Sequence, residues 1–265
     1  MVKSFFDFGA LRALRGDWIS CKSPGTNPGD FWQSWQFWQS YSDLPGSHRQ
    51  NSGRRIKIYS YFMALSPSFA GVILAAGASS RMGRDKALLP WRDGTFLSAA
   101  IRALQPATEL VIVVAGANAP SLAPIADSQA AFLAVNPNPQ QGQFSSLLVG
   151  LQDVLNRGRD AAIVTLVDRP PAEVETIEQI KAAFLSSDDN IWAVVPEFGG
   201  KHGHPFVIGR EMIEAFLRAP VGSSAREVEH ANQQHIRYFP VNDPLVVANV
   251  DTPEDFEKLR AGTAI

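Results

Sequence analysis

From residue 71 onward, short apolar runs alternate along the chain with segments of helical periodicity. The clearest runs are GVILA at Gly71–Ala75, ELVIVVA at Glu109–Ala115 and AAIVTLV at Ala161–Val167. Short apolar runs bounded by turn residues are typical of strands that are buried on both faces. Strands separated by helices predict a three-layer α/β domain, built on a mostly parallel sheet with right-handed connections.

The other expected elements continue this alternation. Further strands are expected at Ala131–Val135, Ile191–Val195 and Pro205–Ile208, with a last one inside Pro244–Val250. Helices are expected from about Thr95, its N-cap, at Gln143–Leu155, at 172–186, at Glu211–Leu217 and from Pro253, with Thr252 as its cap. Sheets of this kind bind ligands beyond the carboxyl ends of their strands, where we expect Gly77, Asp168 and Asp251.

The first 62 residues differ from the rest. They hold eight Lys and Arg against four Asp and Glu, carry four of the six tryptophans, and show no alternation of strands and helices. We interpret residues 1–62 as a poorly ordered extension, or as residues upstream of a true start at Met63. The aromatic stretch Phe31–Tyr41 leaves a membrane-surface or partner-binding helix as the alternative. The expected functional domain is 63–265.

A loop of small residues follows the first expected strand, in the run LAAGASSRMGRDK at Leu74–Lys86. Its small side chains, Ser79 among them, let the main chain approach a ligand closely, and Gly77 can adopt a positive φ. Backbone N–H groups, the guanidinium of Arg81 and the ammonium of Lys86 all suit phosphate oxygens. The run has neither the GK[ST] of a Walker motif nor a GxGxxG fingerprint. It predicts a loop that holds a nucleoside triphosphate by its phosphates; a glycine-rich turn with two surface cations is the alternative.

Two aspartates lie where strands are expected to end. Asp168 follows a strand in LVDRP, and Asp251 follows another in NVDTPEDF. Phosphoryl and nucleotidyl transfers need a divalent cation to neutralise the polyphosphate, and Mg²⁺ usually takes one or two carboxylates plus phosphate oxygens. The alternative is that both residues are turn or capping residues.

The run LAAGASSRMGRDKALLPW at Leu74–Trp91 resembles the signature of the molybdenum cofactor nucleotidyltransferases, above all of their cytidylyltransferase branch. Sugar-nucleotide pyrophosphorylases share a looser version of it. The resemblance extends from about Ala70 to Leu259 and implies the Rossmann-like fold of the nucleotide-diphospho-sugar transferases. It further implies that Leu74, Ala75, Ala76 and Gly77 lie along the nucleotide, that Arg81 and Lys86 hold its phosphates, and that Asp168 and Asp251 bind Mg²⁺.

Weaker motifs complete the resemblance. GQFSSLLVGL resembles the family's serine-rich helix start, which implies that Ser145 and Ser146 contact the base or ribose, although serines there also cap helices. HGHPFVI matches a Gly-His-Pro motif near the acceptor pocket and makes His204 a candidate acceptor contact. GSSAREV departs from the family's Gly-Asp-x-Gly-Ala-Arg motif because Ser223 replaces the aspartate. That departure leaves the identity of the acceptor open.

The resemblance implies that an acceptor phosphate attacks the α-phosphorus of a nucleoside triphosphate and that pyrophosphate leaves. Arg81, Lys86 and Asp168 are the expected catalytic residues. LAAG at Leu74–Gly77, where the guanylyl branch usually has LAGG, favours CTP, and LLPW agrees, whereas GRDKALL is close to the guanylyl pattern. The expected acceptor is a molybdopterin-type phosphate. The alternatives are GTP as donor, a sugar phosphate as acceptor, and a non-catalytic nucleotide-binding regulator.

Composition restricts the setting of this reaction. A formal net charge of -2 supplies no field that would attract nucleic acid, and no apolar run approaches the roughly 20 residues of a membrane span. A single cysteine excludes an internal disulfide framework, so we expect a reducing cytoplasm. A molybdoenzyme or its chaperone is the expected partner that receives the product.

Overall fold

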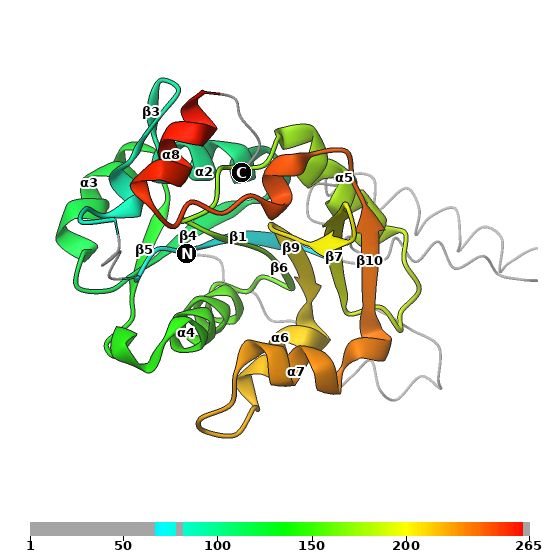
Figure 1. The fold of residues 1–265 in the computed structure, drawn as a ribbon. Coiled ribbons are helices and arrows are strands. Elements are labelled where there is room, and N and C mark those ends of the chain that lie inside the picture. The colour runs from blue at the N-terminus through cyan, green and yellow to red at the C-terminus, as the bar shows by residue number, and fades with distance from the viewer. Residues whose placement is uncertain (1–66, 78–81, 262–265) are drawn as a thin grey trace, which may run out of the picture. The chain divides into compact units, whose positions relative to one another are not determined.

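The computed structural model describes residues 67–77 and 82–261, which form a central sheet with helices on both faces (Figure 1). The sheet strands are β1 (Phe69–Leu74), β4 (Leu110–Ala115), β5 (Phe132–Val135), β6 (Ala161–Leu166), β7 (Ala193–Phe198), β8 (Lys201–His202), β9 (Phe206–Gly209) and β10 (Ile236–Pro240). The helices are α2 (Phe96–Leu104), α3 (Ala119–Ser128), α4 (Gln143–Asn156), α5 (Val174–Leu185), α6 (Arg210–Leu217), α7 (Ala225–Ala231) and α8 (Pro253–Arg260). The hairpin of β2 (Pro90–Trp91) and β3 (Gly94–Thr95) precedes α2. The expected extension 1–62, Ser79 and Arg81 all lie outside the described residues.

The sheet is mostly parallel, as expected. Its strand order is β10-β7-β9-β6-β1-β4-β5, with β8 paired to β7. β1 runs parallel to β4 and β6, β4 to β5, and β7 to β10, whereas β9 is antiparallel to both of its neighbours. The three longest apolar runs of the sequence, β4, β1 and β6, therefore lie side by side in the middle of the sheet.

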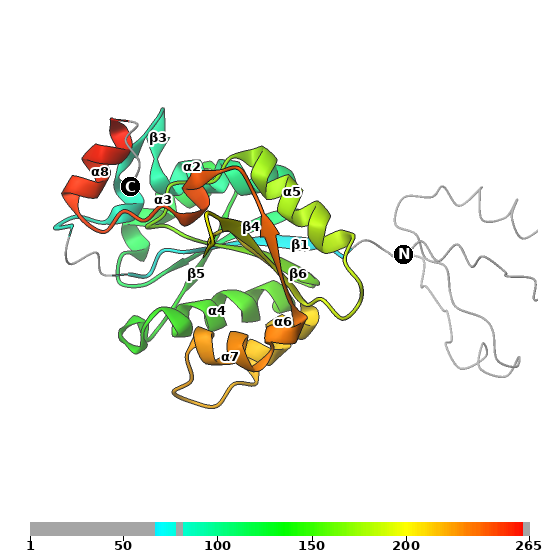
Figure 2. The ribbon, with the colours of Figure 1, turned by 45° about the vertical axis from the view of Figure 1, so that its right-hand side comes forward.

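Helices form a layer on each face of this sheet. The two ribbon views agree that α2, α3 and α5 cover one face and that α4, α6 and α7 cover the other (Figures 1 and 2). Successive side chains of β1 enter the two layers in turn: Phe69 and Ile73 pack with the first set of helices, Val72 and Leu74 with the second. No helix in the described part of the chain is long and apolar enough to cross a membrane.

The helix α4 lies especially close to the sheet because it carries a glycine at the contact. A Cβ atom at Gly150 would lie 2.7 Å from Val72 Cγ1 and 3.0 Å from Val114 Cγ2, closer than packed carbon atoms tolerate. The absence of a side chain here sets the distance between α4 and the strands that lead to the ligand-binding edge.

The two expected helix caps are confirmed. The Thr95 hydroxyl accepts from the Ser98 backbone N–H at 3.1 Å, and the Ser98 hydroxyl receives the Thr95 N–H at 2.8 Å. Thr252 and Asp255 form the same reciprocal pair at the start of α8. Each pair satisfies backbone donors that a helix start leaves without a partner inside the helix.

The prediction of a strand inside Pro244–Val250 is wrong. Pro244–Val247 is a short 3₁₀ helix, and the Asp243 side chain caps it by accepting from the Leu245 N–H at 2.9 Å. The last strand is β10, which ends before this segment. Asp251 therefore follows an irregular segment and not a strand, although it still reaches the carboxyl-terminal edge of the sheet.

Candidate functional site

The carboxyl end of β1 opens into the small-residue loop. The Ala75 N–H continues the sheet by donating to the Val114 carbonyl at 2.8 Å. After Gly77 the next described residue is Met82, whose side chain is buried in a small cluster that includes Phe96 and Phe256. The described ends of the loop are thus anchored, one in the sheet and one under α8.

Asp85 and Asn118 bind the loop to the neighbouring strand connection. Asn118 Nδ2 donates to the Ala75 carbonyl at 2.8 Å and to Asp85 Oδ2 at 2.7 Å, while its Oδ1 accepts from the Gly116 N–H at 3.0 Å. The other Asp85 oxygen accepts from the Ala87 N–H at 2.9 Å and caps a 3₁₀ helix at Lys86–Leu88. This network fixes the backbone position from which the Lys86 side chain extends. The sequence motifs predicted no role for Asn118, nor for Asp85, although Asp85 lies within the loop motif.

Lys86 lies between the carboxylates of Asp168 and Asp251, the two predicted metal ligands. Its Nζ is 2.9 Å from Asp251 Oδ1 and 3.6 Å from Asp168 Oδ2, and the lysine is only 8% exposed. Asp251 Oδ2 also accepts from Asn249 Nδ2 at 2.5 Å, and the Val250 N–H donates to the Asp168 carbonyl at 3.1 Å. Residues 86, 168 and 251, far apart in sequence, therefore meet at one point beyond β1 and β6.

The carboxylates at this point could supply part of the coordination shell of a divalent cation, with a bound ligand supplying the rest. Asp168 Oδ1 is buried and accepts no hydrogen bond from the described residues. These residues include no group of three or more His, Cys, Asp or Glu that could enclose a metal by themselves. Mg²⁺ typically takes one or two protein carboxylates and completes its octahedron with phosphate oxygens and water, and two aspartates match that requirement.

Ser145 and Ser146 lie at the start of α4, where Asn136 holds both. Asn136 Nδ2 donates to Ser145 Oγ at 2.8 Å and to Ser146 Oγ at 2.9 Å. Ser145 Oγ in turn donates to the Gly142 carbonyl at 2.7 Å, and Ser146 is buried. Ser145, the more open of the two, is thus the better placed for a ligand, with Asn136 as a positioning residue that the sequence motifs do not reveal.

Arg169 lies between the carboxylates and His204. Its Nη1 is 3.4 Å from the carbonyl oxygens of Val246 and Ala248, and its Nε is buried without a hydrogen bond in the described part of the chain. Burial lowers the pKa of Arg169, while Asp168 and Asp251 act to raise it. Arg169 carries a positive charge beside the two aspartates. The sequence analysis did not name Arg169, although its position directly after Asp168 could have marked it as a candidate.

His204 is a neutral, buried imidazole. Burial first, and then the charge of Arg169, lower the pKa of His204 to about 3. Its backbone N–H donates to the Val246 carbonyl at 2.8 Å, and the preceding Gly203 is required because a Cβ there would lie 2.3 Å from the same oxygen. His204 Nδ1 has no hydrogen-bond partner among the described residues, so it is suited to a polar contact rather than to an ionic one.

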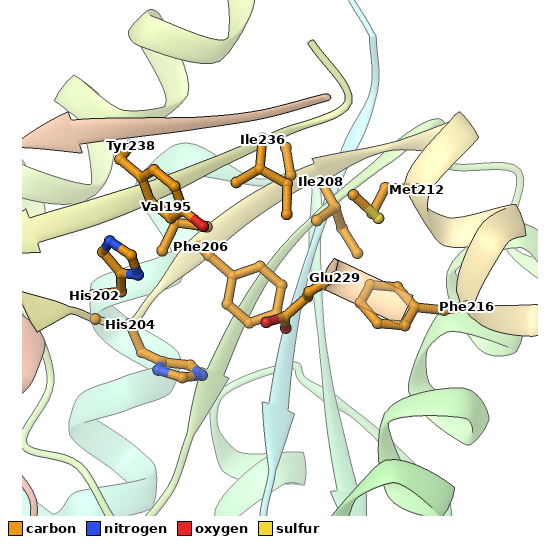
Figure 3. Close-up of a pocket in the computed structure, with 12 residues that line it drawn as sticks. Val195, His202, His204, Phe206, Ile208, Met212, Phe216, Glu229, Ile236 and Tyr238 are labelled. Carbon is orange, nitrogen blue, oxygen red and sulfur yellow. The ribbon is translucent and has the colours of Figure 1, made fainter. Parts of the chain in front are cut away.

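A pocket of about 220 Å³ extends from His204 along β7, β9 and β10 (Figure 3). Most of its wall is apolar and comes from Val195, Phe206, Ile208, Met212, Phe216 and Ile236. The polar side chains on it are His202, His204, Glu229 and Tyr238. The predicted acceptor contact therefore lines a pocket, and its backbone N–H donates to the same Val246 carbonyl that Arg169 Nη1 approaches.

A family model described as the MobA-like NTP transferase domain matches residues 71–237. Nicotine blue oxidoreductase of Paenarthrobacter nicotinovorans is 34% identical over 200 residues, covering 71% of this chain and 89% of that protein. The molybdenum cofactor cytidylyltransferase of Escherichia coli K12 is 25% identical over 186 residues, covering 70% and 92%. The molybdenum cofactor guanylyltransferase of Xanthomonas euvesicatoria is 28% identical over 204 residues, covering 74% and 97%.

A crystal structure of a Mycobacterium tuberculosis H37Rv protein is similar in fold, with a TM-score of 0.63 and 27% identity over 73% of this chain and 97% of that one. The same protein in complex with manganese has a TM-score of 0.57 at 23% identity, over 72% and 97%. The family match covers the sheet from within β1 into β10, and with it the loop after β1 and Asp168. The chain therefore belongs to the MobA-like NTP transferase family.

Proposed function

We propose that this chain transfers a cytidine monophosphate unit from CTP to the phosphate of a molybdopterin-type acceptor and releases pyrophosphate. The observation that carries the proposal is the meeting of Lys86, Asp168 and Asp251 beyond the ends of β1 and β6. A cation and two carboxylates at one edge of the sheet provide what a triphosphate and its metal require.

In this proposal the loop and its cations hold the triphosphate. The main chain of Leu74, Ala75, Ala76, Gly77 and Ser79 approaches the nucleotide, and Arg81 and Lys86 stabilise the charge that accumulates on the leaving pyrophosphate. A preorganised donor of this kind contributes on the order of 3–4 kcal/mol at a transition state. Because Lys86 is buried against Asp251, its ammonium is already oriented before the nucleotide binds.

Asp168 and Asp251 are the proposed ligands of Mg²⁺, which would neutralise charge on the triphosphate and the acceptor phosphate when bound. The orphaned Oδ1 of Asp168 supports this assignment, and so does the manganese complex formed by the similar Mycobacterium tuberculosis protein. A phosphate monoester has a second pKa of about 6 and is already largely ionised at neutral pH. The acceptor therefore needs positioning rather than a general base, and neutral His204 is the proposed contact.

The choice of CTP rests on the loop. Ala76 gives this chain LAAG where the guanylyl branch has LAGG, and Ser145 and Ser146, both held by Asn136, form the proposed base and ribose contacts. Relatives with either specificity in their names are comparably distant, so GTP is the second candidate. The proposed location is the cytoplasm, and a molybdoenzyme or its chaperone is the proposed recipient of the product.

The test is a screen of CTP, GTP, UTP and ATP with Mg²⁺ and either molybdopterin or a sugar 1-phosphate, read as pyrophosphate release. We expect release only when CTP and molybdopterin are both present. Faster release with GTP than with CTP would make GTP the nucleotide donor. Release with a sugar 1-phosphate would make a sugar phosphate the acceptor. No release from any pair, together with a redox change of nicotine blue, would support instead the redox activity in the name of the Paenarthrobacter relative.

A further inference from the structure

The pocket beside His204 contains one carboxylate in a largely apolar and aromatic wall. Glu229 comes from α7, whose start is determined by the reciprocal hydrogen bonds of Ser224 and Glu227. With α7 oriented in this way, Val228 is buried in the core and Glu229 lines the pocket, where Figure 3 shows its carboxylate among the other lining side chains. A solvated glutamate would ordinarily avoid such surroundings.

Glu229 remains accessible to a ligand although the pocket surrounds it. Glu229 as a residue is exposed to solvent. In the described part of the chain its carboxylate accepts no hydrogen bond and belongs to no close ion pair. The walls raise the pKa of Glu229 by desolvation, and His202 partly opposes this effect. A ligand that donated hydrogen bonds to this carboxylate would relieve an existing cost.

The rest of the pocket suits a flat ring. His202 stacks on Tyr238 with ring centroids 3.8 Å apart and an interplanar angle of 8°, and Phe206 lies edge-on to His204 at 5.2 Å. Such walls offer flat aromatic faces but few hydrogen-bonding groups. A sugar would bring hydroxyl groups that these walls leave without partners, which is costly in a closed site.

The pocket and the proposed reaction centre meet at one backbone oxygen. His204 lines the pocket and its N–H donates to the Val246 carbonyl at 2.8 Å, while Nη1 of Arg169, the residue after Asp168, lies 3.4 Å from the same oxygen. An acceptor whose phosphate lay at Asp168 would enter the pocket past His204. The part that enters it is the part distant from the reacting phosphate, where selectivity for the acceptor can be exerted.

We propose that Glu229 makes this pocket selective for an acceptor that carries a flat nitrogen heterocycle with two adjacent N–H donors, and that it thereby rejects sugar phosphates. The two oxygens of one carboxylate accept a parallel pair of N–H bonds, an arrangement with both strength and directionality. The inference rests on the proposed function for the identity of the reaction. It adds a specificity-determining residue that the phosphate loop and the carboxylates do not include.

The test is calorimetric binding of two flat ring systems of equal size to the full chain, without nucleotide or metal. Pterin presents a 2-amino group beside a ring N–H, whereas lumazine has a carbonyl oxygen in place of that amino group. We expect the wild type to bind pterin about tenfold more tightly than lumazine, since paired hydrogen bonds to a charged group contribute at least this factor. Glu229→Gln should remove the preference and weaken pterin binding by about tenfold.

The matched control is Glu178→Gln, which makes the same change at an exposed site on α5, on the other face of the sheet. It should bind pterin like the wild type, and circular dichroism should show all three proteins folded. Any of four results would overturn the inference. Two concern the wild type's relative affinities: lumazine, or glucose 1-phosphate, binds as tightly as pterin. The other two are that the wild type does not bind pterin at all, or that Glu229→Gln binds pterin as tightly as the wild type does.

These outcomes are separate from those of the proposed function. Binding of pterin that depends on Glu229, in a protein that releases no pyrophosphate from any nucleotide, would contradict the transferase proposal and keep the inference. Pyrophosphate release with CTP and molybdopterin, combined with unaltered pterin binding and unaltered turnover in Glu229→Gln, would keep the transferase proposal and overturn the inference.

Discussion

At the scale of single residues, Asp168 tests the proposed metal site most directly, because one of its oxygens has no hydrogen bond within the described chain. Asp168→Asn keeps the size of the side chain and removes its charge. We expect turnover with CTP to fall by at least about 100-fold, the scale of losing a preorganised electrostatic contact. Pyrophosphate release measures the activity, and the thermal midpoint checks the fold.

The control for this change is Asp93→Asn. Asp93 pairs with Arg102 at 2.8 Å on the surface, where ion pairs contribute little. Turnover should be unaltered in that variant. Full turnover in Asp168→Asn itself would contradict the assignment of Asp168 as a metal ligand, whatever becomes of the other residues.

The low pKa of His204 makes stability depend on pH. The folded protein holds this imidazole neutral down to a pKa of about 3, whereas the unfolded chain takes up a proton near the ordinary histidine pKa of 6.5. Its contribution to stability is therefore complete above the unfolded pKa and is lost as pH falls toward the folded value. Between pH 7 and 5 the loss is about 2 kcal/mol.

Urea unfolding at pH 7 and pH 5 measures this dependence. The wild type should lose more unfolding free energy over that interval than His204→Asn, which cannot titrate, and the difference between the two slopes isolates this side chain. Identical pH slopes in both proteins would show that His204 is not held neutral by its surroundings.

Sequence reasoning located residues whose chemistry is readable from type and spacing. Lys86, Asp168 and Asp251, all candidates from the sequence, lie within one small region. Asn118 and Asn136 were not foreseen, because each acts through contacts to carbonyl or hydroxyl groups 43 and 10 residues away. The local sequence around an asparagine does not indicate which distant group it will hydrogen-bond. These contacts are therefore visible only in the folded structure.

At the scale of elements, Gly150 is the position where α4 depends on a missing side chain. Gly150→Val would place new atoms where a Cβ already lies 2.7 Å from Val72 Cγ1. We expect a loss of about 1–3 kcal/mol or more in the free energy of unfolding, the usual cost of overpacking a core. Denaturant unfolding measures it. Gln152→Val introduces the same side chain at an exposed position of α4 and should cost far less; an equal loss there would assign the effect to helix propensity.

Central elements were predictable and peripheral ones were not. β1, β4 and β6 are buried on both faces, so their apolar runs announce them. β10 is an edge strand with the half-exposed sequence IRYFP, and α3 contains Pro124 inside the helix. Pairing with β7 and packing against β5 stabilise these elements, and neither contact is encoded in local periodicity. The apolar run after Asp243 was wrongly predicted to be a strand. Its residue Val246 is buried, as a strand residue would be, but it lies in a 3₁₀ helix.

At the scale of the whole molecule, the sheet and its two helical layers account for a complete α/β domain within the described residues. The core clusters on the two faces draw their members from Phe69 to Val246, and the small cluster under α8 extends to Phe256. Both edge strands and every crossover helix between them come from the same stretch. Within the described residues, every strand of this sheet lies between Phe69 and Pro240.

We therefore propose that residues 63–265 fold and bind nucleotide without residues 1–62. A shortened protein that begins at Met63 should keep its thermal midpoint within about 2–4 °C of the full chain, the shift that about 1 kcal/mol produces in a domain of this size. Its affinity for CTP with Mg²⁺ should be unaltered, because the proposed contacts all lie after Phe69. Differential scanning fluorimetry and calorimetric titration measure the two quantities. An unfolded shortened protein, or one that has lost CTP binding, would make the first 62 residues an integral part of the domain.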